Sequence, residues 1–399
     1  MNIFIPRTLD LSNLLKKKSF FLFGPRSTGK SSLLKRQLPE ARRIDLLDSS
    51  FLLRLSQSPQ DLQAIAESAG PIGPQDLVVI DEVQKVPELL NEVHRLIEDR
   101  GWRFLLTGSS ARKLKATGVN LLAGRAWIAK LFPLTSCELG DTFNLEKALL
   151  YGSLPQVYIS GYPTEELAAY VTTYINEEVK QEGLVRKIPS FLTFLKLAAL
   201  TNGQMLNFAK LASDTGVAAT TIREYYRILE DTLIGTMLEA WQDSTKRKAI
   251  TTSKFYFFDC GVVHRIQDIR ALERHSDLYG RAFEHWLFCE LSAYLSYTRS
   301  LDTLRYWRST TQFEVDFLVG TTAAIEVKAA NKIQKSDLKS LLALREEGVF
   351  KYFYLVSHDP VEALKDGIYC LHWRTFLERL WSHKLWQDVG SHKTGGSSV

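Results

Sequence analysis

The sequence predicts an α/β protein of several domains: a parallel-sheet domain, a helical connector with a winged helix, and a second α/β domain. Three observations predict this arrangement. With 399 residues, the chain is too long for one ordinary hydrophobic core. Before residue 140, short apolar runs alternate with helical patterns, which is typical of a parallel sheet covered by helices. Farther along, helical periodicity dominates until a strand hairpin near residue 320.

The composition is that of a globular chain with a mild basic bias. The formal net charge of +5 is compatible with nucleic-acid contact but far from a histone-like balance. No segment approaches the ~18 uncharged residues needed to cross a bilayer, and the N-terminal lysines follow the apolar residues, unlike those of a secretory signal. Four scattered cysteines without a CxxC pair argue against a zinc site and a disulfide framework. We therefore expect a cytoplasmic protein without a membrane partner.

A phosphate-binding loop follows the first predicted strand. The apolar residues 19–23 precede GPRSTGKS at residues 24–31 and a helical segment, and the loop matches G-x-x-x-x-G-K-[ST]. Its glycines let backbone N–H groups approach phosphate oxygens, Lys30 is expected to contact the β- and γ-phosphates, and Ser31 to bind Mg²⁺. A glycine-rich turn with an incidental lysine is the alternative. The expected loop contacts are Gly24, Pro25, Arg26, Ser27, Thr28, Gly29, Lys30, Ser31 and Ser32.

A second apolar strand, at residues 77–80, ends in two acids. Asp81 is expected to hold Mg²⁺ directly or through water, and Glu82 to orient and polarise the attacking water. This pairing predicts hydrolysis of a nucleoside triphosphate in addition to binding. Strands near residues 44–46, 102–108 and 126–132 complete a predicted five-stranded parallel sheet.

The segments GPRSTGK, DEVQK, LTGSS, LAGR and PLTSCEL together resemble the AAA+ superfamily, and more narrowly a large prokaryotic family of predicted ATPases. The resemblance covers the first 140 residues and implies ATP as the nucleotide. It also implies a γ-phosphate sensor among the hydroxyls that end the strand near residues 102–108, namely Thr107, Ser109 and Ser110. Ser109 is favoured, and a helix cap is the alternative. Arg125 is the candidate arginine finger acting across a boundary between identical subunits, with a surface salt bridge as the alternative. No second sensor arginine is identified, which leaves ring formation open.

The middle of the chain reads as helical. Residues 145–200 are broken at residues 152–155 by a glycine-proline turn that the resembling family shares, and residues 206–233 read as two helices around a turn at Gly216. This helix-turn-helix pattern predicts either DNA contact or a scaffold. The segment KFYFFDCG, which ends in Asp259 and Gly261, continues the family resemblance. The candidate DNA-binding residues are Thr221, Arg223 and Arg227 on the second helix and Lys246, Arg247 and Lys248 at the tip of a wing.

The last third contains a second group of acids. Glu284 lies within an apolar stripe of a helix predicted at residues 281–297, where a carboxylate needs a partner. Two strands around Gly320 then form a predicted hairpin. On the second of these strands, Glu326 and Lys328 share a face by the period-two rule.

Asp316, followed ten residues later by Glu-x-Lys, is similar to the core signature of PD-(D/E)XK, or restriction-endonuclease-like, phosphodiesterases, and Glu284 matches their helical acid. The resemblance implies that Asp316 and Glu326 bind Mg²⁺ with help from Glu284. It implies that Lys328 stabilises the developing phosphate charge or assists the water nucleophile. An active nuclease and a retained fold that binds without cutting both remain open.

These inferences predict an ATPase domain at residues 1–140, a connector and winged helix at 141–270, a nuclease-like domain at 271–385 and a disordered tail at 386–399. The predicted function is ATP hydrolysis that acts on DNA through the two later domains. The alternative is a nucleotide-gated interaction protein whose nuclease-like domain is an inactive scaffold.

Overall fold

The computed structural model describes residues 4–108, 122, 124–175 and 188–386. Contacts between residues divide the chain into two units. Unit 1 comprises Met1–Leu238 and Thr252–Ser300, and unit 2 comprises Glu239–Thr251 and Leu301–Val399. The chain therefore enters unit 2 twice, and the helix expected to open the third domain belongs to unit 1. The expected domain limits stay predictions.

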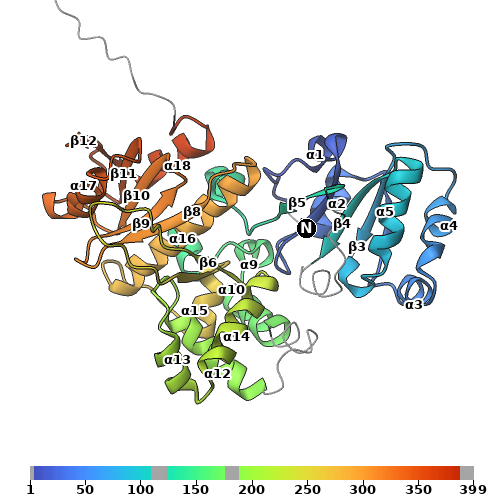
Figure 1. Ribbon diagram of the computed structural model, residues 1–399, viewed down its shortest axis with the longest axis horizontal. Helices are drawn as coiled ribbons and strands as arrows, with labels where there is room; N and C mark the ends of the chain where they lie inside the picture. Colours follow the sequence, from blue (N-terminus) through green and yellow to red (C-terminus); the bar gives the residue numbers. More distant parts are fainter. Residues whose placement is uncertain (1–3, 109–121, 123, 176–187, 387–399) are drawn as a thin grey trace, which may run out of the picture. The chain divides into compact units, whose positions relative to one another are not determined.

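A parallel sheet of five strands begins unit 1 (Figure 1). The strands cross the sheet in the order β2-β3-β4-β1-β5, and all neighbours are parallel. The predicted α/β fold with a parallel five-stranded sheet is therefore confirmed. The strands are β1 (Ser19–Phe23), β2 (Arg42–Asp45), β3 (Leu77–Asp81), β4 (Arg103–Gly108) and β5 (Ala126–Lys130).

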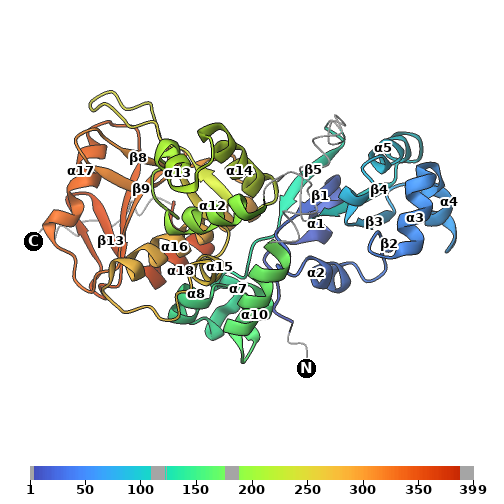
Figure 2. The same ribbon diagram turned by 90° about the horizontal axis from the view of Figure 1, so that it is seen from below.

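Helices cover both faces of this sheet, because alternate residues of a strand point to opposite sides. Phe20 and Leu22 of β1 pack in one core cluster with the first two helices, whereas Phe21 and Phe23 pack in another with the next three. Figure 2 shows these helices around the strands from below. The helices are α1 (Leu11–Lys17), α2 (Lys30–Gln37), α3 (Ser49–Gln57), α4 (Leu62–Glu67) and α5 (Leu89–Arg100).

The rest of unit 1 is mainly helical. The helix-turn-helix prediction is confirmed as a local structure: Gly216 ends the first helix with φ 64°, and Ile222, Tyr225 and Tyr226 of the second are buried. A short antiparallel strand pair follows. The elements are α7 (Ser136–Leu139), α8 (Leu145–Tyr151), α9 (Pro155–Ile159), α10 (Pro163–Ala169), a π-helix (Tyr170–Ile175), α12 (Ile188–Leu200), α13 (Phe208–Thr215), α14 (Ala219–Asp231), β6 (Gly235–Leu238), β7 (Lys254–Phe257), α15 (Cys260–Ile266) and α16 (Asp277–Tyr297).

Residues 246–248 lie in the segment between β6 and β7, where Lys246 and Lys248 are exposed. The chain between β6 and β7 passes into unit 2, where Arg247 donates a hydrogen bond to the carbonyl oxygen of Ala343 at 2.9 Å. The carboxylate of Glu347 accepts the backbone N–H of Thr245 at 2.7 Å. Arg247 is therefore bound within unit 2, and the DNA-binding role of residues 246–248 stays a prediction.

Unit 2 contains a mixed sheet of six strands in the order β12-β13-β11-β10-β9-β8. The predicted hairpin is β9–β10, and its turn contains Gly320 with φ 51°. Phe353 and Leu355 face the cluster that contains α17, whereas Tyr354 between them packs on Phe376 of α18, so the two helices cover opposite faces. The elements are β8 (Leu304–Arg308), β9 (Glu314–Val319), β10 (Ala323–Lys328), α17 (Lys339–Arg345), β11 (Tyr352–Ser357), β12 (Ala363–Lys365), β13 (Ile368–His372) and α18 (Trp373–Trp381).

Candidate functional site

The phosphate-binding loop connects β1 to α2, and each of its two glycines has a steric reason. A Cβ atom at Gly24 would lie 2.5 Å from the carbonyl oxygen of Leu131, because β5 passes close to the loop. Gly29 has φ 92°, a left-handed conformation that side chains disfavour, and it is the N-cap of α2. The helix therefore begins at Lys30 with its positive end at the loop.

The side chain of Lys30 forms hydrogen bonds within the loop. Its ammonium group donates to the carbonyl oxygens of Gly24 at 2.6 Å and Pro25 at 3.0 Å, and only 7% of the residue is exposed. The hydroxyl of Thr28 also donates to Pro25, at 2.8 Å. Phosphate oxygens are stronger acceptors than these carbonyl groups, so an incoming nucleotide can take over the lysine.

The remaining loop residues differ in exposure. Arg26 is half-buried, Ser27 has φ 62°, and Ser31 and Ser32 at the start of α2 are exposed to solvent. The hydroxyl of Ser31 is therefore accessible to an ion or a ligand.

The ends of β3 and β4 bring three polar residues together. The hydroxyl of Thr107 donates to the carboxylate of Asp81 and accepts the backbone N–H of Glu82 at 3.2 Å. Thr107 lies opposite Leu22 of β1, so β4 lies between the strand that leads into the loop and the strand that ends in the acids. Thr107 is one of the three hydroxyls expected at the end of β4, although Ser109 was favoured as the sensor. Its signal in the sequence is a single hydroxyl in an otherwise apolar strand, but the strand order is needed to interpret it.

Glu82 is held in an unusual conformation. Its φ of 60° lies in the left-handed region, which is uncommon for a residue with a side chain and is enriched at functional sites. Its carboxylate accepts a hydrogen bond from the amide of Gln84. The acid that was expected to orient water is thus fixed by the glutamine of the DEVQK segment, a role that sequence reasoning did not assign.

The two expected γ-phosphate residues have different outcomes. Ser109 lies outside the described residues, so its role stays a prediction. The guanidinium group of Arg125 pairs with the carboxylate of Glu98. This contact favours the surface salt bridge for the isolated chain, and the role across a subunit boundary stays a prediction.

A cavity of about 530 Å³ lies beside the loop within unit 1. Its volume falls within the range of ~300–1,000 Å³ typical of small-molecule sites. The N-terminal segment contributes Phe4 and Ile5, the loop contributes Ser27 and Gly29, and the start of α9 contributes Pro155. The lining is mixed, because the polar residues Arg7 and Gln156 also contribute to it.

The glycine-proline turn and the DCG segment contact each other within unit 1. The carboxylate of Asp259 accepts the N–H of Ser153 at 2.7 Å and that of Val262 at 3.2 Å, and it caps α15. Cβ atoms would clash at both glycines: at Gly152 with the carboxylate of Asp259, and at Gly261 with the carbonyl oxygen of Tyr151 at 2.0 Å.

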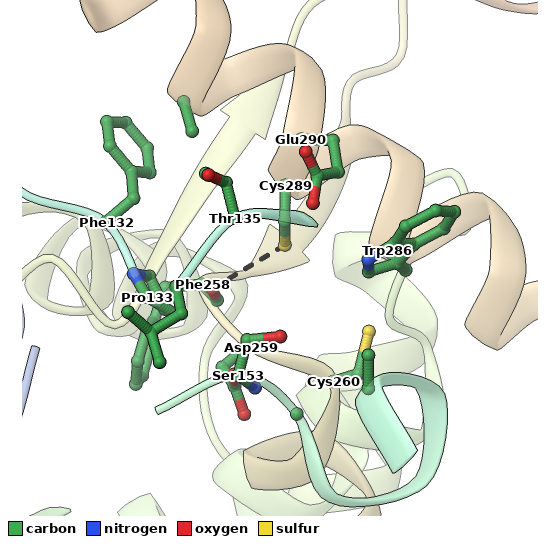
Figure 3. Close-up of a pocket in the computed structure, with 14 residues that line it drawn as sticks. Phe132, Pro133, Thr135, Ser153, Phe258, Asp259, Cys260, Trp286, Cys289 and Glu290 are labelled. Atoms are coloured by element: carbon green, nitrogen blue, oxygen red, sulfur yellow. Dashed lines mark hydrogen bonds between the residues drawn. The ribbon is translucent and has the colours of Figure 1, made fainter. Parts of the chain in front are cut away.

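Asp259 lies beside a cavity of about 20 Å³, whose side chains Figure 3 shows. Burial raises the pKa of Asp259 to about 6, although the surrounding backbone N–H groups oppose this shift. The nearby His285 is also buried, which lowers its pKa to about 4, and it contacts the carbonyl oxygen of Phe257 at 2.6 Å. Both groups favour their neutral forms because the interior solvates charge poorly.

Three of the four nuclease-like residues lie together on the β9–β10 hairpin of unit 2. The register that pairs Ile325 with Phe317 brings Glu326 opposite Asp316. Asp316 accepts the backbone N–H of Val327 at 2.8 Å. Both acids are buried, and directly opposed carboxylates repel each other unless a cation lies between or beside them.

Lys328 supplies one such positive charge. Its ammonium group lies 2.5 Å from a carboxylate oxygen of Glu326. Within the described part of the chain, no group of three or more His, Cys, Asp or Glu side chains is placed to hold a metal ion. The hairpin therefore offers a set of two carboxylates.

Glu284, the expected helical acid, belongs to unit 1, whereas the other three residues belong to unit 2. Its carboxylate lies 3.2 Å from the ammonium group of Lys254 and accepts the hydroxyl of Tyr256. The partner expected for this half-buried acid is thus supplied by β7. Its role in a metal site stays a prediction.

The expected DNA-binding face of α14 is accessible. Arg223 and Arg227 are exposed and Thr221 is half-buried. The guanidinium group of Arg223 lies 4.8 Å from the ring centre of Phe208, and that of Arg227 lies 3.9 Å from Asp231.

Comparison with known proteins supports the assignment of the first part of unit 1. Residues 16–140 match a family described as an AAA domain. Residues 142–273 and 279–376 match two families described as domains of unknown function, DUF8612 and DUF4143. With the strand order and the phosphate loop, the first match defines an AAA-type ATPase domain at residues 16–140, which binds nucleotide.

The curated relatives are uncharacterised bacterial proteins. One from Mycobacterium tuberculosis is 29% identical over 343 residues, which span 81% of this chain and 74% of the relative. Another from Haemophilus influenzae is 22% identical over 295 residues, which span 67% of this chain and 72% of the relative.

The solved structures that match this chain include two proteins of Aeropyrum pernix. The ORC2 protein in its ADP form has a TM-score of 0.34 and 16% identity, and covers 65% of this chain and 91% of its own. The ORC1 protein in complex with DNA has a TM-score of 0.30 and 10% identity, and the match covers 67% of this chain and 94% of the ORC1 chain.

Among the described residues, no helix has the length and apolar character needed to span a bilayer.

Proposed function

We propose that the protein binds ATP together with Mg²⁺ at the phosphate-binding loop and hydrolyses it. The observation that carries this proposal is the adjacency of β1, β4 and β3, whose ends supply Lys30, Thr107 and the acid pair Asp81 and Glu82. A phosphate cradle alone would support binding, whereas the acid pair adds the groups that activate water.

The donor set fits a hard divalent cation. The exposed hydroxyl of Ser31 and the carboxylate of Asp81 are oxygen ligands of the kind that Mg²⁺ prefers. When bound, the cation would neutralise the negative charge that develops on the phosphates. The hydroxyl of Thr107 already fixes the orientation of the Asp81 carboxylate.

Lys30, Glu82 and the residues that line the cavity have the remaining roles. Lys30 leaves the carbonyl oxygens of Gly24 and Pro25 for the β- and γ-phosphates. Glu82, held by Gln84, orients the attacking water and accepts its proton. The adenosine part occupies the cavity of about 530 Å³ between the loop and α9.

Release of inorganic phosphate from Mg·ATP tests this proposal. Wild type should turn over, and Lys30→Ala should abolish both nucleotide binding and turnover. Omission of Mg²⁺ should stop turnover. Wild-type protein that binds ATP without releasing phosphate would refute hydrolysis.

We also propose that the protein acts on DNA, with the exposed side of α14 as the contact. The accessible guanidinium groups of Arg223 and Arg227 and the mild basic charge support it. DNA-stimulated ATPase activity, lost in Arg223→Glu, is the expected result. If neither duplex nor single-stranded DNA binds or changes turnover, a nucleotide-gated interaction protein is the better description.

A second candidate function is Mg²⁺-dependent cleavage of nucleic acid by unit 2. The opposed, buried carboxylates of Asp316 and Glu326 favour it, because such a pair fits a hard cation and Lys328 lies beside it to stabilise phosphate charge. Cleavage should require Mg²⁺ and disappear in Asp316→Ala, with Glu314→Ala on the same strand as control. If wild type cuts no DNA or RNA offered to it, unit 2 is a scaffold.

A further inference from the structure

Arg7, in the segment before α1, has a side chain that is only 4% exposed and contacts the phosphate loop. Its guanidinium group donates to the carbonyl oxygen of Thr28 in the phosphate loop at 2.7 Å and to that of Phe132 at 2.6 Å. It also donates to the hydroxyl of Tyr297 at 3.1 Å and pairs with Glu138 at 3.0 Å. These contacts join segments from opposite ends of unit 1's sequence.

The partners of Arg7 are themselves fixed. Glu138 is 1% exposed, and its carboxylate also accepts the N–H groups of Thr8 at 2.8 Å and Thr135 at 3.0 Å. The hydroxyl of Tyr297 accepts the N–H of Phe132 at 3.1 Å. Burial alone would lower the pKa of Arg7, but its neighbours Tyr297 and Glu138 raise it, so the arginine is held charged. A buried charge with this many partners has a fixed position.

The contact with Thr28 matters because a peptide group is planar. The C=O of Thr28 and the N–H of Gly29 belong to one trans peptide and point in opposite directions. When Arg7 binds this C=O, it fixes the Gly29 N–H to point away from Arg7. That N–H is one of the loop donors expected to approach phosphate, and Gly29 has the conformational freedom to turn it elsewhere.

We propose that Arg7 is a positioning residue of the nucleotide site, which holds the Thr28–Gly29 peptide in the orientation that binds phosphate, and that Tyr297 anchors it to α16. This inference rests on the proposed nucleotide binding and adds a residue that acts through the loop backbone. Because α16 ends at Tyr297, the anchor lies four residues before the chain enters unit 2 at Leu301. The same contacts therefore couple nucleotide occupancy to the end of α16.

The test compares ligands with and without phosphate. Dissociation constants of Mg·ADP and of adenosine are measured by calorimetry for wild type, Arg7→Lys, Tyr297→Phe and the double variant. Lysine retains the charge beside Glu138 but cannot reproduce the planar fork. One lost hydrogen bond to a charged ligand predicts about tenfold weaker Mg·ADP binding in Arg7→Lys. Adenosine binding should weaken by a smaller factor, because Arg7 also lines the cavity proposed for adenosine.

The double variant tests the anchor. Tyr297→Phe should weaken Mg·ADP binding by a smaller factor, and the double variant should bind no more weakly than Arg7→Lys, because Tyr297 acts through Arg7. Arg274→Lys, the same change at an exposed arginine paired with Glu146, is the control and should match wild type. If Arg7→Lys does not fold, Tyr297→Phe alone decides, since unchanged Mg·ADP binding in that variant overturns the anchor.

Three results would overturn the proposal. They are unchanged Mg·ADP binding in folded Arg7→Lys, equal losses for Mg·ADP and adenosine, and additive losses in the double variant. Wild type that binds ADP without hydrolysing ATP refutes the proposed hydrolysis but leaves this comparison decisive. Wild type that binds neither nucleotide overturns both.

Discussion

Glu82 combines a left-handed backbone with a carboxylate that Gln84 holds in place. Glu82→Gln removes the group that accepts the proton of the attacking water and leaves Lys30 and the loop unchanged. We expect ATP affinity within about threefold of wild type and turnover reduced ~10²–10⁴-fold. Calorimetric binding and phosphate release measure the two quantities. Turnover at the wild-type level would show that another group activates water.

Asp259 and His285 impose opposite pH dependences on the stability of unit 1. The pKa of Asp259 rises from ~3.9 in the unfolded chain to about 6 in the folded protein. The stability that Asp259 contributes is therefore fully present below pH ~3.9 and is lost as the pH rises through 6. The pKa of His285 falls from ~6.5 in the unfolded chain to about 4 in the folded protein. The stability that His285 contributes is therefore fully present above pH ~6.5 and is lost as the pH falls through 4. The two dependences largely cancel in the wild type.

Asp259→Asn should expose the histidine dependence. When the pH is lowered from 7 to 4, the unfolding free energy of the wild type should increase by about 2–3 kcal/mol relative to that of the variant. Urea unfolding at several pH values measures this change. The hydrogen bonds lost at Ser153 affect stability equally at every pH, so the slopes of unfolding free energy against pH are compared rather than the values. Parallel pH profiles would contradict the assignment.

At the scale of elements, α8 and α15 approach so closely that neither interface glycine tolerates a Cβ atom. Gly261→Ala would place that atom 2.0 Å from the carbonyl oxygen of Tyr151 and force the two helices apart. We expect a loss of about 3 kcal/mol or more in unfolding free energy. In Gly280→Ala, on α16, the added atom has no neighbour within 4 Å, and a gain of ~0.4–1 kcal/mol is expected. Thermal unfolding compares them, and equal effects would refute the close approach.

The elements that local patterns predict are those whose partners are close in the sequence. The stripe of Ile222, Tyr225 and Tyr226 and the glycine turn at Gly320 are readable because helix and hairpin periodicity determine them. The partners of Arg247 and Glu284 are not readable, because they lie 96 and 30 residues away. The phosphate loop and the acids of β3 were found from residue type and order. Arg7 was missed because a single arginine before the first helix has no local pattern.

At the scale of the molecule, nucleotide binding should stabilise unit 1 selectively. Ligand at ~100 times its dissociation constant stabilises a binding-competent fold by about 2.7 kcal/mol. Amide hydrogen exchange with and without saturating Mg·ADP should therefore slow in β1, β3 and β4 and remain unchanged in β10 and β11. Lys30→Ala should remove the effect. Equal slowing in both units would show that they unfold as one cooperative body.

The double passage of the chain into unit 2 has a consequence for synthesis on the ribosome. Residues 239–251 emerge long before Glu347 and Phe350, with which Ser244 and Trp241 make their contacts. Trp241 is buried when unit 2 is complete, so it remains without its packing partner while about a hundred further residues are added. At 5–20 residues per second that interval lasts roughly 5–20 seconds. Nascent chains therefore expose the indole ring of Trp241 during this window, and a stop codon near residue 300 makes that exposure permanent.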